Sequence, residues 1–174
     1  MKRKIFFAVM LGAVLMIVNS CTKESQDALV DTIFPDKMSA TINDTAWTSV
    51  TRATTKQLNR FIINGVSTSG KTLNITINGS AKGTYNLNIN VLTDTLSANM
   101  SAFYKRSATT SINDIYYASR GSVTLSDVNT TDKVISGTFN MTMFKADTDN
   151  AFIKTDSVIV ESGVFDGIKY IENN

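Results

Sequence analysis

The chain after residue 38 alternates apolar and polar residues, and this period of two constrains the fold more than any other feature of the sequence. Residues 73–78 read LNITIN and residues 83–91 read GTYNLNINV, so each segment has one apolar and one polar face. Strands of this kind belong to antiparallel sheets with one solvated face, because a parallel sheet is covered on both sides and its strands are apolar throughout. The pattern predicts an all-β domain.

Turn residues divide the domain into eight or nine such segments, a spacing typical of β-sandwiches and β-barrels. We therefore predict an antiparallel β-sandwich, with a β-barrel as the alternative. Asn78-Gly79 predicts a hairpin between the segments before and after it, because both residues tolerate positive φ. In residues 134–144 the alternation places Phe139 towards the core. The expected strands cover residues 39–43, 60–66, 73–78, 83–91, 98–104, a segment around 123–125, 134–144 and 158–165.

The first residues have the pattern of a secretion signal. Lys2, Arg3 and Lys4 precede fourteen uncharged residues, 5–18. A helix of that length rises about 21 Å, which is short of the roughly 30 Å of a bilayer's hydrocarbon core. We therefore interpret residues 1–20 as a cleaved signal peptide with a helical apolar part, and not as a membrane-spanning helix.

Residues 18–21 read Val-Asn-Ser-Cys and resemble the lipobox of bacterial lipoproteins. The resemblance implies cleavage before Cys21, the only cysteine of the chain, and acylation of its thiol and of the new amino terminus. Each buried methylene adds about 0.8 kcal/mol to membrane binding, so two or three acyl chains hold a protein firmly and one does not. The alternative is an ordinary signal peptide that leaves Cys21 as a free thiol.

Residues 21–37 are polar, lack a strand period and include Pro35, the only proline of the chain. They predict a lipidated, flexible tether between the membrane and a single domain at residues 38–174. Thr22 follows the cysteine where lipoproteins retained in the inner membrane have Asp, and Lys23-Glu24 resembles the surface-export signal of Bacteroidetes lipoproteins. These resemblances imply an outer-membrane protein, at either face of that membrane.

Charge and residue types exclude several functions. The chain has 17 Lys and Arg against 15 Asp and Glu, and without the three basic residues of the signal peptide the counts are 14 and 15, a net charge of −1. Nucleic-acid binding needs clustered basic charge, so we expect no nucleic-acid partner. The chain has no histidine, which excludes Ser-His-Asp and Cys-His catalysis and removes the commonest transition-metal ligand. We predict no cofactor.

Five short motifs of the domain occur in order along the chain. They are Ala40-Thr-Ile-Asn43 with Trp47, Gly83-Thr-Tyr85, Gly121-Ser-Val-Thr-Leu125, Ile135-Ser-Gly-Thr-Phe139 and Gly163-Val-Phe165. Together they resemble a family of small Bacteroidetes lipoproteins of unknown function, with an A-x-I-N-G-x-x-W opening, a central G-T-Y and closing I-x-G-T-F and G-x-F strands. Asp44 stands where that family usually has Gly. The resemblance implies an exported β-rich domain and carries over no catalytic residue.

Acidic residues suggest two kinds of site, and we favour neither. Residues 147–150, Asp-Thr-Asp-Asn, offer alternate oxygen ligands for Ca²⁺ but lack the glycine and the bidentate glutamate of a calcium loop, so they predict a turn and no metal site. A hydrolase needs two carboxyl groups about 5–10 Å apart, such as Asp127 with Asp132 or Asp156 with Glu161. All four acids lie in predicted turns or at strand ends, where carboxylates are ordinary solubilising groups.

Four aromatic residues are candidates for ligand binding, because exposed aromatic faces mark binding sites and can stack on sugars. They are Trp47, Tyr104, Tyr116 and Tyr117. The alternative for Trp47 is to cap one end of the core. Tyr116 and Tyr117 are adjacent in a predicted strand, so their rings point to opposite faces and at most one can join a given surface.

These observations support three hypotheses about function. The leading one is a non-enzymatic, lipid-anchored envelope protein whose β-domain binds a glycan or a protein ligand. The second is a structural or assembly subunit of an envelope complex, which predicts a large apolar patch at a sheet edge and no concave pocket. The third is an Asp/Glu-dependent hydrolase, which predicts two acids converging in a cleft.

Overall fold

A computed structural model describes residues 37–90, 95–108, 115–146 and 152–173, and every regular element in these residues is a β-strand. The predicted all-β domain is confirmed. The signal peptide, Cys21, the tether up to residue 36 and the 147–150 segment lie outside the described residues. The strands are β1 (Lys37–Ile42), β2 (Thr45–Thr48), β3 (Thr51–Gln57), β4 (Arg60–Val66), β5 (Thr72–Ile77), β6 (Gly83–Asn90), β7 (Thr95–Ala98), β8 (Met100–Lys105), β9 (Ile115–Asn129), β10 (Val134–Ala146), β11 (Phe152–Lys169) and β12 (Ile171–Asn173).

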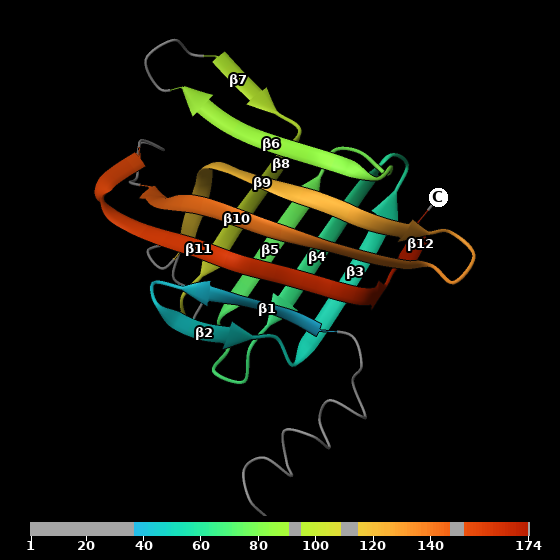
Figure 1. Cartoon of the computed structure of the whole chain (residues 1–174). Coiled ribbons are helices and arrows are strands. Elements are labelled where there is room, and N and C mark those ends of the chain that lie inside the picture. Colours follow the sequence, from blue (N-terminus) through green and yellow to red (C-terminus); the bar gives the residue numbers. More distant parts are fainter. Residues whose placement is uncertain (1–36, 91–94, 109–114, 147–151, 174) are drawn as a thin grey trace, which may run out of the picture. The chain divides into compact units, whose positions relative to one another are not determined.

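The strands form one hydrogen-bonded sheet in the order β12-β3-β4-β5-β8-β9-β10-β11-β1-β2, with β6 attached to β9 and β7 to β6. The pairs are antiparallel, except for the short parallel pair β12–β3. The sheet curls strongly into a half-barrel. In Figure 1, β9, β10, β11 and β1 form a front layer, and β3, β4, β5 and β8 cross behind it. The two layers expected of a sandwich are therefore parts of one continuous sheet.

A bulge and a close-packed glycine help the front layer to bend. The register between β10 and β11 shifts between Phe139 and Met141, and such an extra residue kinks a strand and increases its twist. Gly137 lies at a further shift of this register. A Cβ at this position would come closer than 3.0 Å to the backbone oxygen of Thr124 and to the Phe165 ring. The close approach of these neighbouring strands here requires glycine.

The apolar faces predicted from the alternation fill the space between the layers. On β5 the side chains of Leu73, Ile75 and Ile77 are buried, while the residues between them are partly exposed. Phe139 on β10 is 2% exposed and stacks on Phe165 of β11, with ring centroids 6.2 Å apart. The predicted core position of Phe139 is confirmed.

A two-residue turn joins β1 and β2. Ile42 pairs with Thr45, so Asn43 and Asp44 make the turn, and their φ angles are 45° and 59°. Asn and Asp are the non-glycine residues that best tolerate this left-handed backbone, which a hairpin of this length favours. Asp44 therefore fits the position at which the resembling family usually has glycine.

The hairpin predicted at Asn78-Gly79 is wrong. β5 pairs with β4 and β8, and β6 pairs with β7 and β9, so the strands on either side of these residues are not partners. The backbone N–H of Asn78 donates instead to the carbonyl of Asn99 at 2.9 Å. A Cβ at Gly79 would overlap the Tyr85 ring, so glycine is needed here for a close approach and not for positive φ.

The last residues join the two layers of the sheet. After β11 the chain turns at Tyr170 and β12 pairs with β3. The Tyr170 ring packs edge-on against Phe61, with centroids 5.2 Å apart. The Glu172 carboxylate binds the ammonium groups of Lys56 at 2.8 Å and Lys133 at 3.3 Å. In the part of the chain that the structure describes, no helix is long and apolar enough to span a membrane.

Candidate functional site

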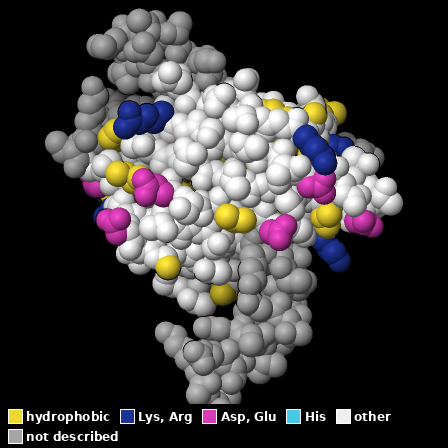
Figure 2. Space-filling model, viewed as in Figure 1, with side chains coloured by type: hydrophobic (Ala, Val, Ile, Leu, Met, Phe, Trp, Pro, Cys, Tyr) yellow, Lys and Arg dark blue, Asp and Glu magenta, His cyan; other side chains and the backbone are white. Residues whose placement is uncertain are grey.

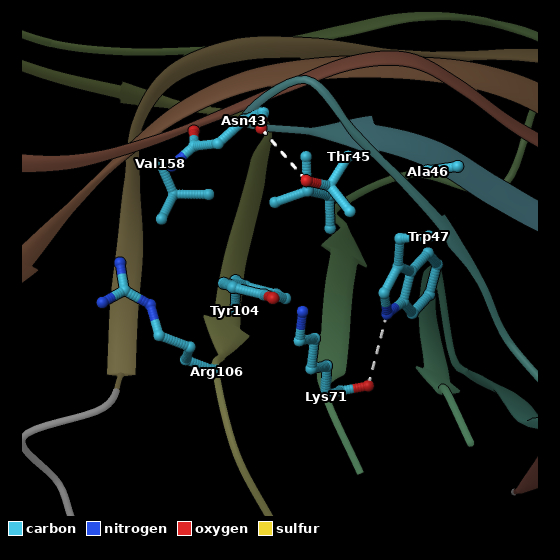
Figure 3. A pocket seen from close by; sticks show the side chains of 9 residues that line it. Asn43, Thr45, Ala46, Trp47, Lys71, Tyr104, Arg106 and Val158 are labelled. Carbon is cyan, nitrogen blue, oxygen red and sulfur yellow. Dashed lines mark hydrogen bonds between the residues drawn. The ribbon is translucent and has the colours of Figure 1, made fainter. Parts of the chain in front are cut away.

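A cleft of about 260 Å³ lies where the β1–β2 turn meets the ends of β5 and β8 and the middle of β11 (Figure 3). The strand order places these segments together only because the sheet curls, since β2 and β5 stand far apart along it. We call this cleft the end pocket. The lining residues are Ile42, Asn43, Thr45, Ala46, Trp47, Lys71, Tyr104, Arg106 and Val158.

The floor of the end pocket is apolar and aromatic. Ile42, Trp47, Tyr104 and Val158 line it, and each is at most 7% exposed. The alternation along β1, β2, β8 and β11 turns these side chains inward. Trp47 belongs both to the core cluster and to the floor of the pocket. Its indole N–H donates to the Lys71 carbonyl at 3.4 Å. The floor is thus the outer end of the hydrophobic core.

The rim of the end pocket is polar and exposed. Asn43 and Thr45 come from the β1–β2 turn, where the Thr45 hydroxyl donates to the Asn43 carbonyl at 3.4 Å. The Asn43 side-chain oxygen accepts a hydrogen bond from the backbone N–H of Ile159 at 2.8 Å, and the Asn43 N–H donates to the Ile159 carbonyl at 3.0 Å. These bonds fix the turn against β11. The rim therefore presents amide and hydroxyl groups on a backbone that these hydrogen bonds hold in place.

Two cations and no carboxylate line the end pocket. Figure 3 shows the Lys71 side chain directed between Tyr104 and Trp47. The turn before β5 holds the Lys71 backbone, because the Lys71 N–H donates to the Ser67 hydroxyl at 3.1 Å and the Lys71 carbonyl accepts the Ser67 N–H at 2.9 Å. None of the ion pairs among the described residues involves Lys71.

Arg106 is held by groups behind the end pocket. Its guanidinium lies 4.7 Å from the centroid of the Tyr116 ring and 3.7 Å from an oxygen of Asp156. Asp156 also accepts a hydrogen bond from the Tyr116 hydroxyl at 3.0 Å and lies 4.0 Å from the Lys145 ammonium. Arg106 thus has a carboxylate partner, whereas Lys71 has none in the described part of the chain.

Burial raises the pKa of the Tyr104 phenol, and the charge of Arg106 partly offsets this effect. The Tyr104 hydroxyl therefore stays protonated at neutral pH and can donate a hydrogen bond. Together the residues of the end pocket can bind a small ligand with an apolar face, polar groups at its edge and an acceptor for a cation.

The structure brings three of the four aromatic candidates to this end of the domain. Trp47 and Tyr104 line the end pocket, and both are buried, so they form part of its floor and are not an open stacking surface. Tyr116 lies behind Tyr104, with ring centroids 6.4 Å apart, and is 1% exposed. Tyr117 is 43% exposed and lies on the opposite face of β9, as the alternation requires.

Sequence reasoning missed the polar members of the end pocket, which are Asn43, Thr45, Lys71 and Arg106. Asn43 stands in the opening motif, and Asn is a residue type that indicates a turn. Lys71 and Arg106 carried no such signal, because an isolated basic residue or a basic pair such as Lys105-Arg106 is ordinarily solvated surface.

The four acidic residues considered for hydrolysis lie outside the lining of the end pocket. Asp156 and Glu161 are five residues apart on β11, a separation of about 16 Å along a strand, which exceeds the spacing of a glycosidase pair. Asp127 pairs with Lys82 at 2.6 Å, and this hydrogen bond lowers the pKa of Asp127. Asp132 accepts a hydrogen bond from the Asn129 side chain at 2.7 Å. Among the described residues, no three His, Cys, Asp or Glu side chains form a group that could hold a metal ion.

The outer face of the front layer is polar. Figure 2 shows this face with its hydrophobic side chains scattered among uncharged polar groups and isolated charges. Ile159 and Val164 on β11 are 47% and 41% exposed. A more open hollow of about 340 Å³ lies over β9, β10 and β11, with Arg120 and Glu161 both in its lining. Its mixed charge gives no preference for a ligand.

Comparison with known proteins places the chain in a family. The family described as Domain of unknown function (DUF6252) matches residues 36–168, which include every residue of the end pocket and all five sequence motifs. No curated protein and no solved structure matches the chain. The predicted resemblance to a family of unknown function is confirmed to this extent. The chain therefore belongs to the DUF6252 family of domains of unknown function.

Proposed function

We propose that the protein is a non-enzymatic, lipid-anchored protein of the outer membrane whose β-domain binds a saccharide in the end pocket. The observation that carries the proposal is the composition of this pocket. A buried aromatic and apolar floor, an exposed rim of amide and hydroxyl groups and a cation without a carboxylate partner among the described residues meet in one concave site.

A saccharide suits these groups because a sugar ring has an apolar C–H face and a polar edge of hydroxyl groups. The floor formed by Tyr104 and Trp47 offers the apolar contact, and Asn43 and Thr45 offer polar partners at the rim. The volume of about 260 Å³ is just below the roughly 300–1,000 Å³ of pockets for drug-sized ligands. The end pocket therefore suits one sugar unit, such as the end of a longer glycan.

The sequence around Cys21 supports the membrane part of the proposal. The motif at residues 18–21 and the apolar segment before it resemble a lipoprotein signal, and residues 22–36 would form the tether between lipid and β1. Cys21→Ser should move the protein from the membrane fraction to the soluble fraction of the native host, because the only thiol that can be acylated is removed. Unchanged membrane fractionation, or mass spectrometry of a native product with residue 21 unacylated, would refute lipid anchoring.

Two observations favour binding over the structural alternative. A structural subunit predicts a large apolar patch and no concave site, whereas the described residues form the end pocket, and the face in Figure 2 has scattered apolar side chains. The separation of Asp156 and Glu161 along β11 likewise favours binding over glycoside hydrolysis by this pair.

The test uses the intrinsic fluorescence of Trp47, the only tryptophan of the chain, which lies in the floor of the end pocket. Titration with monosaccharides and short glycans should shift or quench this emission with saturation. Thr45→Phe should weaken the response by placing a ring at the pocket, whereas Thr48→Phe, at an exposed position of the same strand outside the lining, should leave it unchanged. A glycan screen that gives no saturable response, or an equal response from both variants, would refute saccharide binding here.

A further inference from the structure

The electrostatics of the end pocket indicate the charge of its ligand. Of the nine lining residues, two are basic, Lys71 and Arg106, and none is acidic. Sugars without charge need no cation, whereas a cation with no carboxylate in the lining of its pocket can pair with an anionic group of a ligand. The distribution of charge in the pocket therefore favours a ligand with a negative group.

Lys71 is the residue best placed to receive that group. Arg106 already lies against the Asp156 carboxylate and over the Tyr116 ring, so its charge is partly compensated by the domain itself. The Lys71 side chain instead points between Tyr104 and Trp47, and its backbone is fixed by the turn before β5. An anion at the Lys71 ammonium would have the aromatic floor beside it and the Tyr104 hydroxyl as a further donor.

We infer that the end pocket binds an acidic sugar, with the carboxylate of a uronic acid at Lys71 and the sugar ring against the floor formed by Tyr104 and Trp47. This inference rests on the proposed saccharide binding and adds the charge of the sugar. A charge-assisted hydrogen bond contributes about 1.5–3 kcal/mol, so the acidic sugar should bind roughly tenfold or more tightly than its neutral counterpart.

The experiment compares matched sugars by the fluorescence of Trp47 in the whole exported protein. D-glucuronate and D-galacturonate should bind at least about tenfold more tightly than D-glucose and D-galactose. Lys71→Met should abolish this preference and leave the weak binding of the neutral sugars. Lys71→Arg, which keeps the positive charge, should retain part of the preference. Lys169→Met, at an exposed position of β11 outside the pocket, is the control for loss of a positive charge.

The outcomes separate the two proposals. Equal binding of acidic and neutral sugars, or a preference that survives Lys71→Met, would overturn the inference and leave saccharide binding in place. Binding of inorganic phosphate as tight as that of D-glucuronate would overturn the sugar part, because the site would then recognise a simple anion. No saturable response to any of these sugars, with circular dichroism showing folded protein, would refute both proposals for these ligands.

Discussion

The contact between Phe139 and Gly163 offers a strict test of how the core of this domain packs. The two residues are cross-strand partners on β10 and β11, and the Phe139 ring occupies the space that a Cβ at position 163 would need. Phe139 is 2% exposed and also stacks on Phe165. Removal of the ring and addition of a methyl group at Gly163 should therefore have coupled effects on stability.

Phe139→Ala should lower the free energy of unfolding by about 3–5 kcal/mol, the range for truncation of a buried phenylalanine. Gly163→Ala should lower it by about 1–3 kcal/mol, because the new methyl group must displace the ring or the backbone. In the double variant the ring is absent and the methyl group fills part of the cavity. The cost of Gly163→Ala should then largely disappear, which corresponds to a coupling energy of about 1–3 kcal/mol.

Equilibrium urea denaturation of the four proteins, followed by circular dichroism, measures this cycle. Each variant should unfold with an unchanged m-value, so that differences in midpoint report stability. Additive costs, within about 0.5 kcal/mol, would show that the ring does not occupy the space next to Gly163. An unchanged midpoint for Phe139→Ala would show that the ring is not in the core.

Three further changes test other parts of the structure. Tyr170→Phe should raise the free energy of unfolding by about 1 kcal/mol in thermal or urea unfolding, because the buried Tyr170 hydroxyl has no hydrogen-bond partner in the described part of the chain; a loss of stability would reveal a partner. The hydrogen bond from Lys56 lowers the pKa of Glu172 below its ordinary 4.5, so the stability that this carboxylate contributes is complete above 4.5 and is lost as the pH falls through the lowered value. Glu172→Gln should therefore flatten the acid limb of a plot of Tm against pH, whereas Glu161→Gln, outside this network, should not; equal effects would rule out the network as the cause. Leu58→Gly should raise the free energy of unfolding by up to about 1 kcal/mol and so raise Tm slightly. Leu58 is 90% exposed with a φ of 52°, and the strain of leucine in this left-handed conformation exceeds the entropy cost of glycine. A lower Tm would contradict this strain.

Where the alternation is clear, the sequence predicted both the boundaries of a strand and which of its side chains are buried. Residues 60–66 coincide with β4, and residues 73–78 differ from β5 by one residue at each end. The burial of alternate residues there follows from the pleat, because successive side chains point to opposite faces. The strands that the sequence did not indicate are short or lack an alternation of buried apolar residues. β3 reads TRATTKQ with only Thr54 buried, and β12 has three exposed residues.

The wrong hairpin has a different cause. Asn78-Gly79 has the local chemistry of a tight turn, but β5 lies between β4 and β8 in the sheet, where its apolar face is buried in the core between the layers. Local turn preference amounts to about a kilocalorie per mole, and the burial of several apolar side chains exceeds it. Glycine at 79 then allows the Tyr85 ring to pack closely.

In the candidate site, too, the sequence indicated single residues but not which of them lie together. Trp47 and Tyr104 could be selected from the sequence as aromatic residues in a β-domain, but their distance along the chain gave no reason to combine them with Lys71. Leu73 pairs with Tyr104 across β5 and β8, and this register brings the start of β5 to the end of β8. The curl of the sheet then adds the β1–β2 turn with Asn43.

The sequence by itself determined the all-β class and the face on which each side chain of a clear strand lies, because a period of two is a property of the extended backbone. The tertiary structure alone decided which strands are neighbours, how the single sheet curls and which side chains meet in the end pocket. These depend on contacts between residues far apart in the chain, where the gain from burying apolar faces outweighs local preference and no short segment carries the information.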